Sequence, residues 1–313
     1  MTRVVLACSA ALVPGSDPTS GSGSGPEAIS WLAEQYGAEV VTLMLDFGRG
    51  REIEALRDRA LAAGAVRAHV LDVANEFAAD FVLPALKAGA LYLDGRPSGP
   101  GLERMVTAQK LVEVAAIEQT TAVAHGYSAR TRQFAAAVTA LDERLTVIAL
   151  PESAIGSADG SQDLGSVSTP SRRSEPAFVD LAFVRGAPTA VNGVTMPLTD
   201  LLSSINMLAG THAGHVNHRE TAASMLLHDA HRGLQESVTS DQSERRAIGR
   251  QYAELIDSGA WFSPARHTLD AAVDRLEEPV SGTVRLRLLN DDCHIVEIGL
   301  LDARRKVEVR TSA

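Results

Sequence analysis

Short, mostly apolar runs alternate with helix-spaced apolar residues along the first half of the chain. The runs are typical of strands buried on both faces and occupy residues 4–7, 40–45, 69–73, 122–124 and 146–149. Apolar side chains at helical spacing lie between them, at residues 28–36, 53–60, 77–86 and 102–115. This alternation predicts an α/β fold, a parallel sheet with helices on both faces, in a first domain at residues 1–150.

The predicted sheet directs attention to the loops that follow its strands. Right-handed crossovers bring the carboxyl ends of parallel strands to one edge of the sheet. Ligands of such sheets bind beyond that edge. The loops after Ala7, Leu45 and Ala124 are therefore the expected ligand-binding segments.

The pattern changes in the second half of the chain. Residues 151–176 are rich in Gly, Ser and Asp, which predicts a flexible linker. Beyond it, strand patterns occur at residues 178–184, 189–191, 283–289 and 295–298, and helical patterns occur at residues 198–208, 220–236, 243–256 and 265–276. Residues 177–313 are thus expected to form a smaller mixed α/β domain with C-terminal helices.

Composition narrows the possible functions. The 313 residues are 45% hydrophobic and 22% charged, as in a globular protein. The net charge of −10 gives no basic face for nucleic acid, and no apolar stretch reaches the roughly 18 residues that a membrane span needs. Cys8 and Cys293 form neither a disulfide framework nor a zinc-site spacing, and we expect no signal peptide because no cleavage pattern follows the first apolar run. We expect a cytoplasmic protein with no metal site built from its own side chains.

Several segments, taken in order, resemble the argininosuccinate synthase family. They cover nearly the whole chain and lie at residues 4–7, 31–41, 84–92, 109–113, 123–126, 230–232, 252–255, 261–264 and 282–286. The family belongs to the N-type ATP pyrophosphatases, whose first domain has an adenine nucleotide alpha hydrolase-like fold. The resemblance implies a ligase dependent on ATP and magnesium, which adenylates the ureido oxygen of citrulline and lets the amine of aspartate displace AMP. It also implies a homo-oligomer, a dimer or a tetramer.

The loop after the first strand departs from the family's Ser-Gly-Gly-Leu-Asp-Thr-Ser pattern. In the family, bare backbone and a helix N-terminus cradle the pyrophosphate. Here Ser9 is followed by Ala10 and Ala11, whose β-carbons stand where the backbone must approach a phosphate. A Gly/Ser-rich stretch, residues 12–26, then delays the helix.

Two interpretations of this stretch are open. In the first, a loop released from phosphate binding has drifted into a flexible tract. In the second, Asp17, Thr19 and Ser20 retain the Asp-Thr-Ser chemistry and still bind a phosphate. Pro18 opposes the second interpretation, because it separates Asp17 from Thr19 and removes an N–H donor.

Two further loops resemble the nucleotide-binding loops of the family. Asp46 and Gly48 follow the second strand, although a plain turn explains them equally well. His125 and Gly126 begin the third loop, in which Arg130 replaces a lysine and the family's Asn-Asp pair is absent. His125 is also compatible with a turn histidine whose hydrogen bonds are satisfied within the fold.

The substrate-binding side combines matches and gaps. Tyr92 and Arg104 match family positions that contact citrulline, and Arg104 is suited to bind a carboxylate. Three family features are missing: a threonine between Tyr92 and Arg104, the central Asn-Leu-Trp-Gly-Arg-Ser pattern and a Lys-Ser-Arg-Gly-Val-Tyr-Glu stretch. In the family these segments position the two amino acids for ligation, and such positioning commonly lowers the reaction barrier by about 7–11 kcal/mol. Their loss predicts that ordinary argininosuccinate synthesis has been abandoned.

Three hypotheses follow from these observations. The first is a catalytically silent or repurposed family member that binds a small molecule or a partner. The second is a divergent ligase that still adenylates a substrate and forms AMP and a C–N bond. The third is a partner of an intact argininosuccinate synthase in a mixed oligomer, since the segments expected at subunit contacts remain. No catalytic residue is assigned from the sequence.

Overall fold

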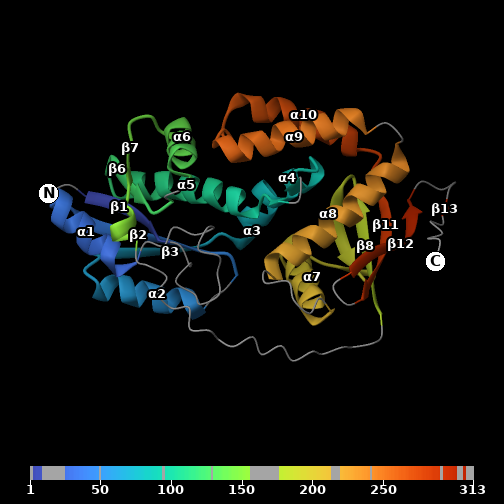
Figure 1. The fold of residues 1–313 in the computed structure, drawn as a ribbon, viewed down its shortest axis with the longest axis horizontal. Helices are drawn as coiled ribbons and strands as arrows, with labels where there is room; N and C mark the ends of the chain where they lie inside the picture. Colours follow the sequence, from blue (N-terminus) through green and yellow to red (C-terminus); the bar gives the residue numbers. More distant parts are fainter. Residues whose placement is uncertain are drawn as a thin grey trace. The chain divides into compact units, whose positions relative to one another are not determined.

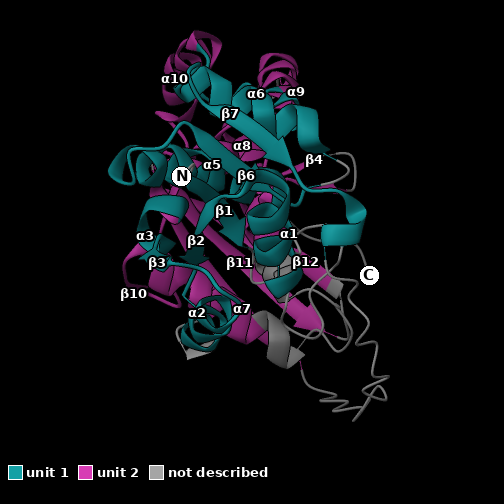
Figure 2. Cartoon of the chain, turned by 90° about the vertical axis from the view of Figure 1, so that its left-hand side faces the viewer, with its two compact units in different colours: residues 1–77, 100–167, 255–263 teal, residues 78–99, 168–254, 264–313 magenta. Residues whose placement is uncertain are grey.

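The chain folds into two compact units, each assembled from stretches separated in sequence (Figure 2). The computed structural model describes residues 3–8, 25–48, 51–93, 96–127, 130–155, 176–212, 219–239, 242–289, 292–301 and 306–307. The first unit takes in residues 1–77, 100–167 and 255–263, and the second takes in residues 78–99, 168–254 and 264–313. The domain boundaries at residues 150 and 177 stay a sequence prediction.

A five-stranded parallel sheet forms the centre of the first unit (Figure 1). Its order is β3-β2-β1-β6-β7, with bounds β1 Arg3–Cys8, β2 Glu39–Asp46, β3 Arg67–Asp72, β6 Ala122–His125 and β7 Thr146–Ala149. The central strands β1 and β2 are buried over most of their length, as their mostly apolar runs predict. The predicted parallel sheet is confirmed.

Helices cover both faces of this sheet (Figure 1). Their bounds are α1 Pro26–Tyr36, α2 Arg51–Ala62, α3 Ala74–Glu76, α5 Gly99–Ile117 and α6 Thr131–Leu141, with a short 3₁₀ turn, η4, at Glu152–Ala154. Pro26 occupies the first turn of α1, where its fixed φ favours helix and its missing N–H costs nothing. Gly37 ends α1 with a φ of 56°, a left-handed conformation that glycine adopts without strain.

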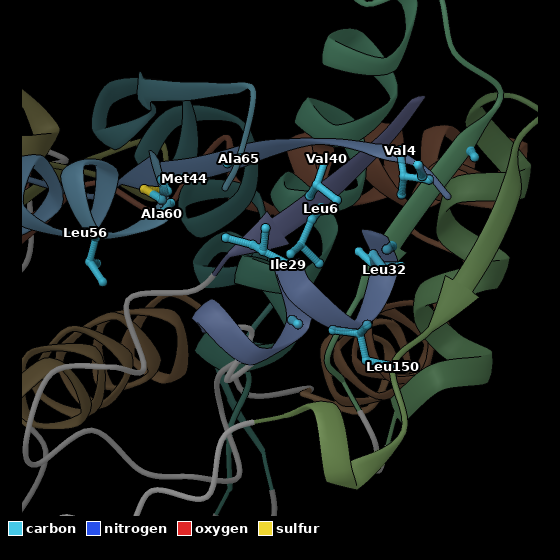
Figure 3. Packing of buried hydrophobic residues seen from close by; sticks show 14 of the residues in the cluster. Val4, Leu6, Ile29, Leu32, Val40, Met44, Leu56, Ala60, Ala65 and Leu150 are labelled. Atoms are coloured by element: carbon cyan, nitrogen blue, oxygen red, sulfur yellow. The ribbon is translucent and has the colours of Figure 1, made fainter. Parts of the chain in front are cut away.

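Side-chain alternation divides the strand residues between the two faces. Val4 and Leu6 pack against Ile29 and Leu32 of α1 in one buried cluster (Figure 3). Ala122 and Ala124 of β6 belong to the same cluster. Because successive side chains on a strand point to opposite faces, His125 points away from α1, toward the face covered by α5 and α6.

The second unit contains a six-stranded antiparallel sheet. Its order is β10-β9-β8-β11-β12-β13, with bounds β8 Ala177–Val184, β9 Ala187–Val191, β10 Val194–Thr195, β11 Gly282–Leu289, β12 Asp292–Leu300 and β13 Lys306–Val307. The predicted hairpin and the predicted C-terminal strands are therefore parts of one sheet. In β8 and β11, apolar residues at alternate positions are buried. These strands and their helices confirm the expected mixed second domain.

The described part of the second unit also contains six helices, of which α7 and α8 pack against the antiparallel sheet. They are η2 Phe77–Val82, a π-helical turn, then α4 Leu83–Lys87, α7 Leu198–His212, α8 Arg219–Val238, α9 Ser243–Ser258 and α10 Pro264–Glu277. A two-stranded ribbon, β4 Tyr92–Leu93 with β5 Arg96–Pro97, belongs to the same unit. Within the described ranges, no helix is long and apolar enough to cross a bilayer.

Candidate functional site

The carboxyl edge of the parallel sheet holds the candidate site. Strands β2, β1 and β6 are neighbours and end at Asp46, Cys8 and His125. The chain runs from β1 to β2 and β3 on one side, whereas β6 and β7 lie on the other side. The strand order therefore reverses between β1 and β6, and the crevice at such a reversal is where doubly wound sheets bind ligands.

A tight turn follows β2 at this edge. The amide of Gly48 donates to Oδ1 of Asp46 over 2.8 Å, and Gly48 has a φ of 97°. Phe47, between them, packs edge-to-face on Phe77 with ring centroids 4.9 Å apart. This geometry explains the aspartate and the glycine as turn residues. Their predicted contact with a nucleotide stays a prediction.

His125 closes β6 in a fully buried position. The backbone N–H of Tyr127 donates to its Nδ1 over 3.1 Å, and its Nε2 has no hydrogen-bond partner among the described residues. Burial lowers the pKa of His125 to about 4, so the ring is neutral near pH 7. Among the described residues, Nδ1 is thus satisfied within the fold, as expected of a turn histidine, whereas Nε2 is not.

Arg104 presents a second unpaired donor in the same unit. Only 5% of the residue is exposed, and no described residue forms a hydrogen bond with its Nε. Burial lowers the pKa of its guanidinium, with Arg130 acting in the same direction and Tyr127, Asp257 and Glu103 acting against it. Arg104, Arg130, Tyr127 and Asp257 therefore share one electrostatic neighbourhood. No acid among the described residues forms a salt bridge with this buried cation, so the position suits an anionic ligand.

Gly101, one turn before Arg104 in α5, leaves space that the side chain of Ile256 fills. A β-carbon at Gly101 would overlap Cγ2 of Ile256 and would lie 3.5 Å from Nη2 of Arg104. The end of α9 is thus packed directly against α5 beside the guanidinium. Sequence reasoning did not assign Asp257, the next residue, because about 150 positions separate it from Arg104 and no motif links the two.

The remaining predicted site residues have separate outcomes. Tyr92 belongs to the second unit, on β4, with its ring centroid 6.1 Å from that of His228. Gly126 follows β6 and is buried. The predicted phosphate-loop residues Ser9, Asp17, Thr19 and Ser20 lie outside the described residues. Among the described side chains, no group of three or more His, Cys, Asp or Glu could hold a metal ion.

Comparison with known protein families matches both halves of the chain. Residues 19–157 match the model described as the N-terminal HUP domain of arginosuccinate synthase, and residues 165–298 match its C-terminal domain. The first match begins after β1, and Ala10 and Ala11 lie outside the matched range.

Individual relatives align over most of their length. The argininosuccinate synthase of Carboxydothermus hydrogenoformans is 33% identical over 83% of this chain and 81% of its own. Its counterpart in Moorella thermoacetica is 32% identical over 85% and 81%, and that of Desulfitobacterium hafniense strain DCB-2 is 31% identical over 86% and 84%. The similarity therefore extends through both units.

Proposed function

The chain belongs to the argininosuccinate synthase family, and from that premise we propose that it is an ATP-dependent, AMP-forming ligase. It joins an amino-acid substrate to an amine through a new C–N bond. The proposed substrate carries a carboxylate and a ureido or amide oxygen, with citrulline as the first compound to test and aspartate as the first amine. Relatives of that name align with about four-fifths of their length to this chain.

Arg104 is the observation that carries the proposal. The buried Nε of Arg104 has no hydrogen-bond partner among the described residues, and a bound ligand would supply one. A substrate carboxylate fits this requirement, since a guanidinium binds it through two parallel N–H donors. Arg130 adds positive charge to the same neighbourhood, and Tyr127 adds a phenol.

The residues at the carboxyl edge fit a nucleotide as the second ligand. Among the described residues, the buried Nε2 of His125 has no hydrogen-bond partner. Asp46, Gly48, His125 and Gly126 would hold the nucleotide at the strand ends. ATP with magnesium would supply the adenylyl group. Arg104 would orient the substrate's ureido or amide oxygen by binding the substrate's carboxylate.

The experiment measures AMP release by the full chain with magnesium-ATP, citrulline and aspartate. Arg104→Gln is expected to raise KM for the carboxylate substrate at least roughly tenfold, since a charge-assisted hydrogen bond is lost. Arg144→Gln is the matched control, because Arg144 is an exposed arginine already paired with Asp142. AMP release that requires neither amino acid, or an Arg104 effect equal to that of Arg144, would overturn the proposal.

A silent or repurposed member is a second candidate, favoured by Ala10 and Ala11. These β-carbons stand at the family's phosphate-binding glycines. Such a protein would bind a carboxylate ligand at Arg104 without releasing AMP. A citrulline-dependent rise in Tm, without turnover of ATP, would favour it over the ligase.

Self-association is proposed from family membership. We expect a homodimer or a homotetramer, and in a cell that also contains an intact argininosuccinate synthase we propose a mixed oligomer of the two chains. Light scattering after size-exclusion chromatography measures the mass of the homo-oligomer. Co-expression of the two chains with different tags tests for the mixed oligomer, and separate elution of the two chains would reject the mixed oligomer.

A further inference from the structure

A groove on the outer side of α1 has a volume of about 470 Å³. Its other walls are Ala63, which follows α2, and Ser153 and Ala154 of η4. The opposite side of α1 packs into the core through Ile29 and Leu32 (Figure 3). The groove therefore has the size of a small-molecule site and lies on the side of α1 that the core does not use.

Four residues of α1 line the groove, and they share one side of the helix because they are three or four positions apart. They are Glu27, Ser30, Trp31 and Glu34. Glu27 and Glu34 are exposed, and Trp31 between them is half-buried. Tyr36 contacts the indole edge-on, with ring centroids 5.8 Å apart and an angle of 69° between the planes. The groove thus presents one aromatic ring with a carboxylate about one turn to either side of it.

The charge of the groove is negative. No lysine, arginine or histidine lines it among the described residues, and neither Glu27 nor Glu34 forms an ion pair or a hydrogen bond with another described side chain. The net charge of the whole chain, −10, adds a field of the same sign. An indole attracts a cation held within about 6 Å of its ring. Carboxylates and indole together therefore select a positively charged ligand.

We propose that this groove binds a small organic cation, an alkylammonium or an alkylguanidinium. The charged head lies between Glu27 and Glu34, beside Trp31. The apolar stem lies against Ala63 and Ala154, which give the groove its hydrocarbon surface. This inference goes beyond the proposed ligase, because binding at α1 requires neither ATP nor turnover.

A structural role explains the same residues differently. Glu27 stands in the first turn of α1, where a carboxylate interacts favourably with the helix dipole. Glu34 would then be a solvated surface residue, and Trp31 would serve only to cover the core. In that case a cation and a neutral molecule of the same shape have equal access to the groove.

The experiment compares n-butylguanidinium, n-butylammonium and the neutral n-butylurea by calorimetry on the full chain, at one ionic strength because salt screens exposed charges. At least one cation is expected to bind saturably and at least roughly fivefold more tightly than n-butylurea. The cation that binds more tightly identifies the preferred head group. Glu34→Gln is expected to weaken that cation about fivefold. Glu54→Gln, on an exposed glutamate of α2 outside the groove, is the matched control.

Tryptophan emission provides a second measurement. The chain has two tryptophans, and Trp261 is fully buried, so a change in emission on binding at the groove reports Trp31. The cation is expected to change the emission of wild type and of Glu54→Gln at the concentrations that saturate the calorimetric signal. Trp31→Phe is expected to lose this change, and if Trp31→Phe fails to fold, the glutamate variants decide.

Four outcomes would overturn the inference. They are no saturable binding of either cation by wild type, binding of n-butylurea as tight as that of the cations, Glu34→Gln binding like Glu54→Gln, and an emission change that persists in folded Trp31→Phe. AMP release by the wild-type chain judges the ligase separately, so either proposal can fail while the other stands.

Discussion

Gly186, in the turn between β8 and β9, leaves no room for a β-carbon because the carboxylate of Glu277 fills that space. Glu277 is itself buried, accepting hydrogen bonds from His231 and Gln235 at 2.8 Å each and pairing with Arg245. The turn, two helices and the end of α10 thus meet at one carboxylate. This buried group organises the second unit.

Replacing Gly186 by alanine is expected to destabilise the protein. Gly186 has a φ of 75°, and the added methyl group also overlaps Glu277, so we expect a loss of about 3 kcal/mol. Gly193→Ala is the control, because Gly193 has a φ of 78° with open space around it and should lose only about 1 kcal/mol. Urea unfolding measures both, and equal losses would contradict the crowding of Gly186.

Glu277→Gln tests the buried charge directly. Burial alone would raise the pKa of Glu277, but His231, Gln235 and Arg245 outweigh it and lower the pKa. Removing the carboxylate charge leaves Arg245 uncompensated and is expected to cost about 3–5 kcal/mol. Glu244→Gln, which breaks only the exposed pair with Arg275, should have little effect. A Tm unchanged in both variants would show that the buried pair contributes nothing.

Stability is expected to fall below neutral pH through His125. Its folded pKa is about 4 against an ordinary value of 6.5. Between these values the unfolded chain binds a proton that the folded chain does not, so stability is complete above pH 6.5 and falls as the pH drops toward 4. From pH 7 to pH 5 this costs about 2 kcal/mol.

His125→Asn should flatten that dependence, since asparagine does not titrate. Urea unfolding at pH 5 and pH 7 compares the two proteins. Burial also lowers the pKa of His228 to about 4. Because His228 remains in the variant, its contribution to the pH dependence of the unfolding free energy is unchanged. An identical pH dependence in wild type and variant would contradict the buried, neutral state of His125.

Gly101→Ala tests how the end of α9 supports Arg104. The methyl group would overlap Ile256, and overpacking of this kind costs about 1–3 kcal/mol. Gly99→Ala, at the start of the same helix with open space around it, is the control. We expect Gly101→Ala alone to lower both Tm and affinity for the carboxylate substrate. If both variants had the same Tm and the same affinity for the carboxylate substrate, Ile256 would not support the position of Arg104.

Much of the fold was predictable because buried strands have mostly apolar runs. Residues 40–45 predicted β2, and the loops after Ala7, Leu45 and Ala124 predicted the carboxyl edge. The neighbourhood of Arg104 was not predictable, because residues 255–263 join the first unit from a distant part of the chain. Nor could the sequence distinguish the two nitrogens of His125, since that depends on the Tyr127 amide.

The most direct test of the ligase follows one oxygen atom. Citrulline labelled with ¹⁸O in its ureido group is incubated with the chain, magnesium-ATP and aspartate, and the AMP is analysed by mass spectrometry. If that oxygen is adenylated and aspartate displaces AMP, the C–O bond breaks and the label leaves in the phosphate of AMP. Labelled AMP, formed in proportion to product, is the predicted result; unlabelled AMP, or no AMP above the aspartate-free control, would contradict it.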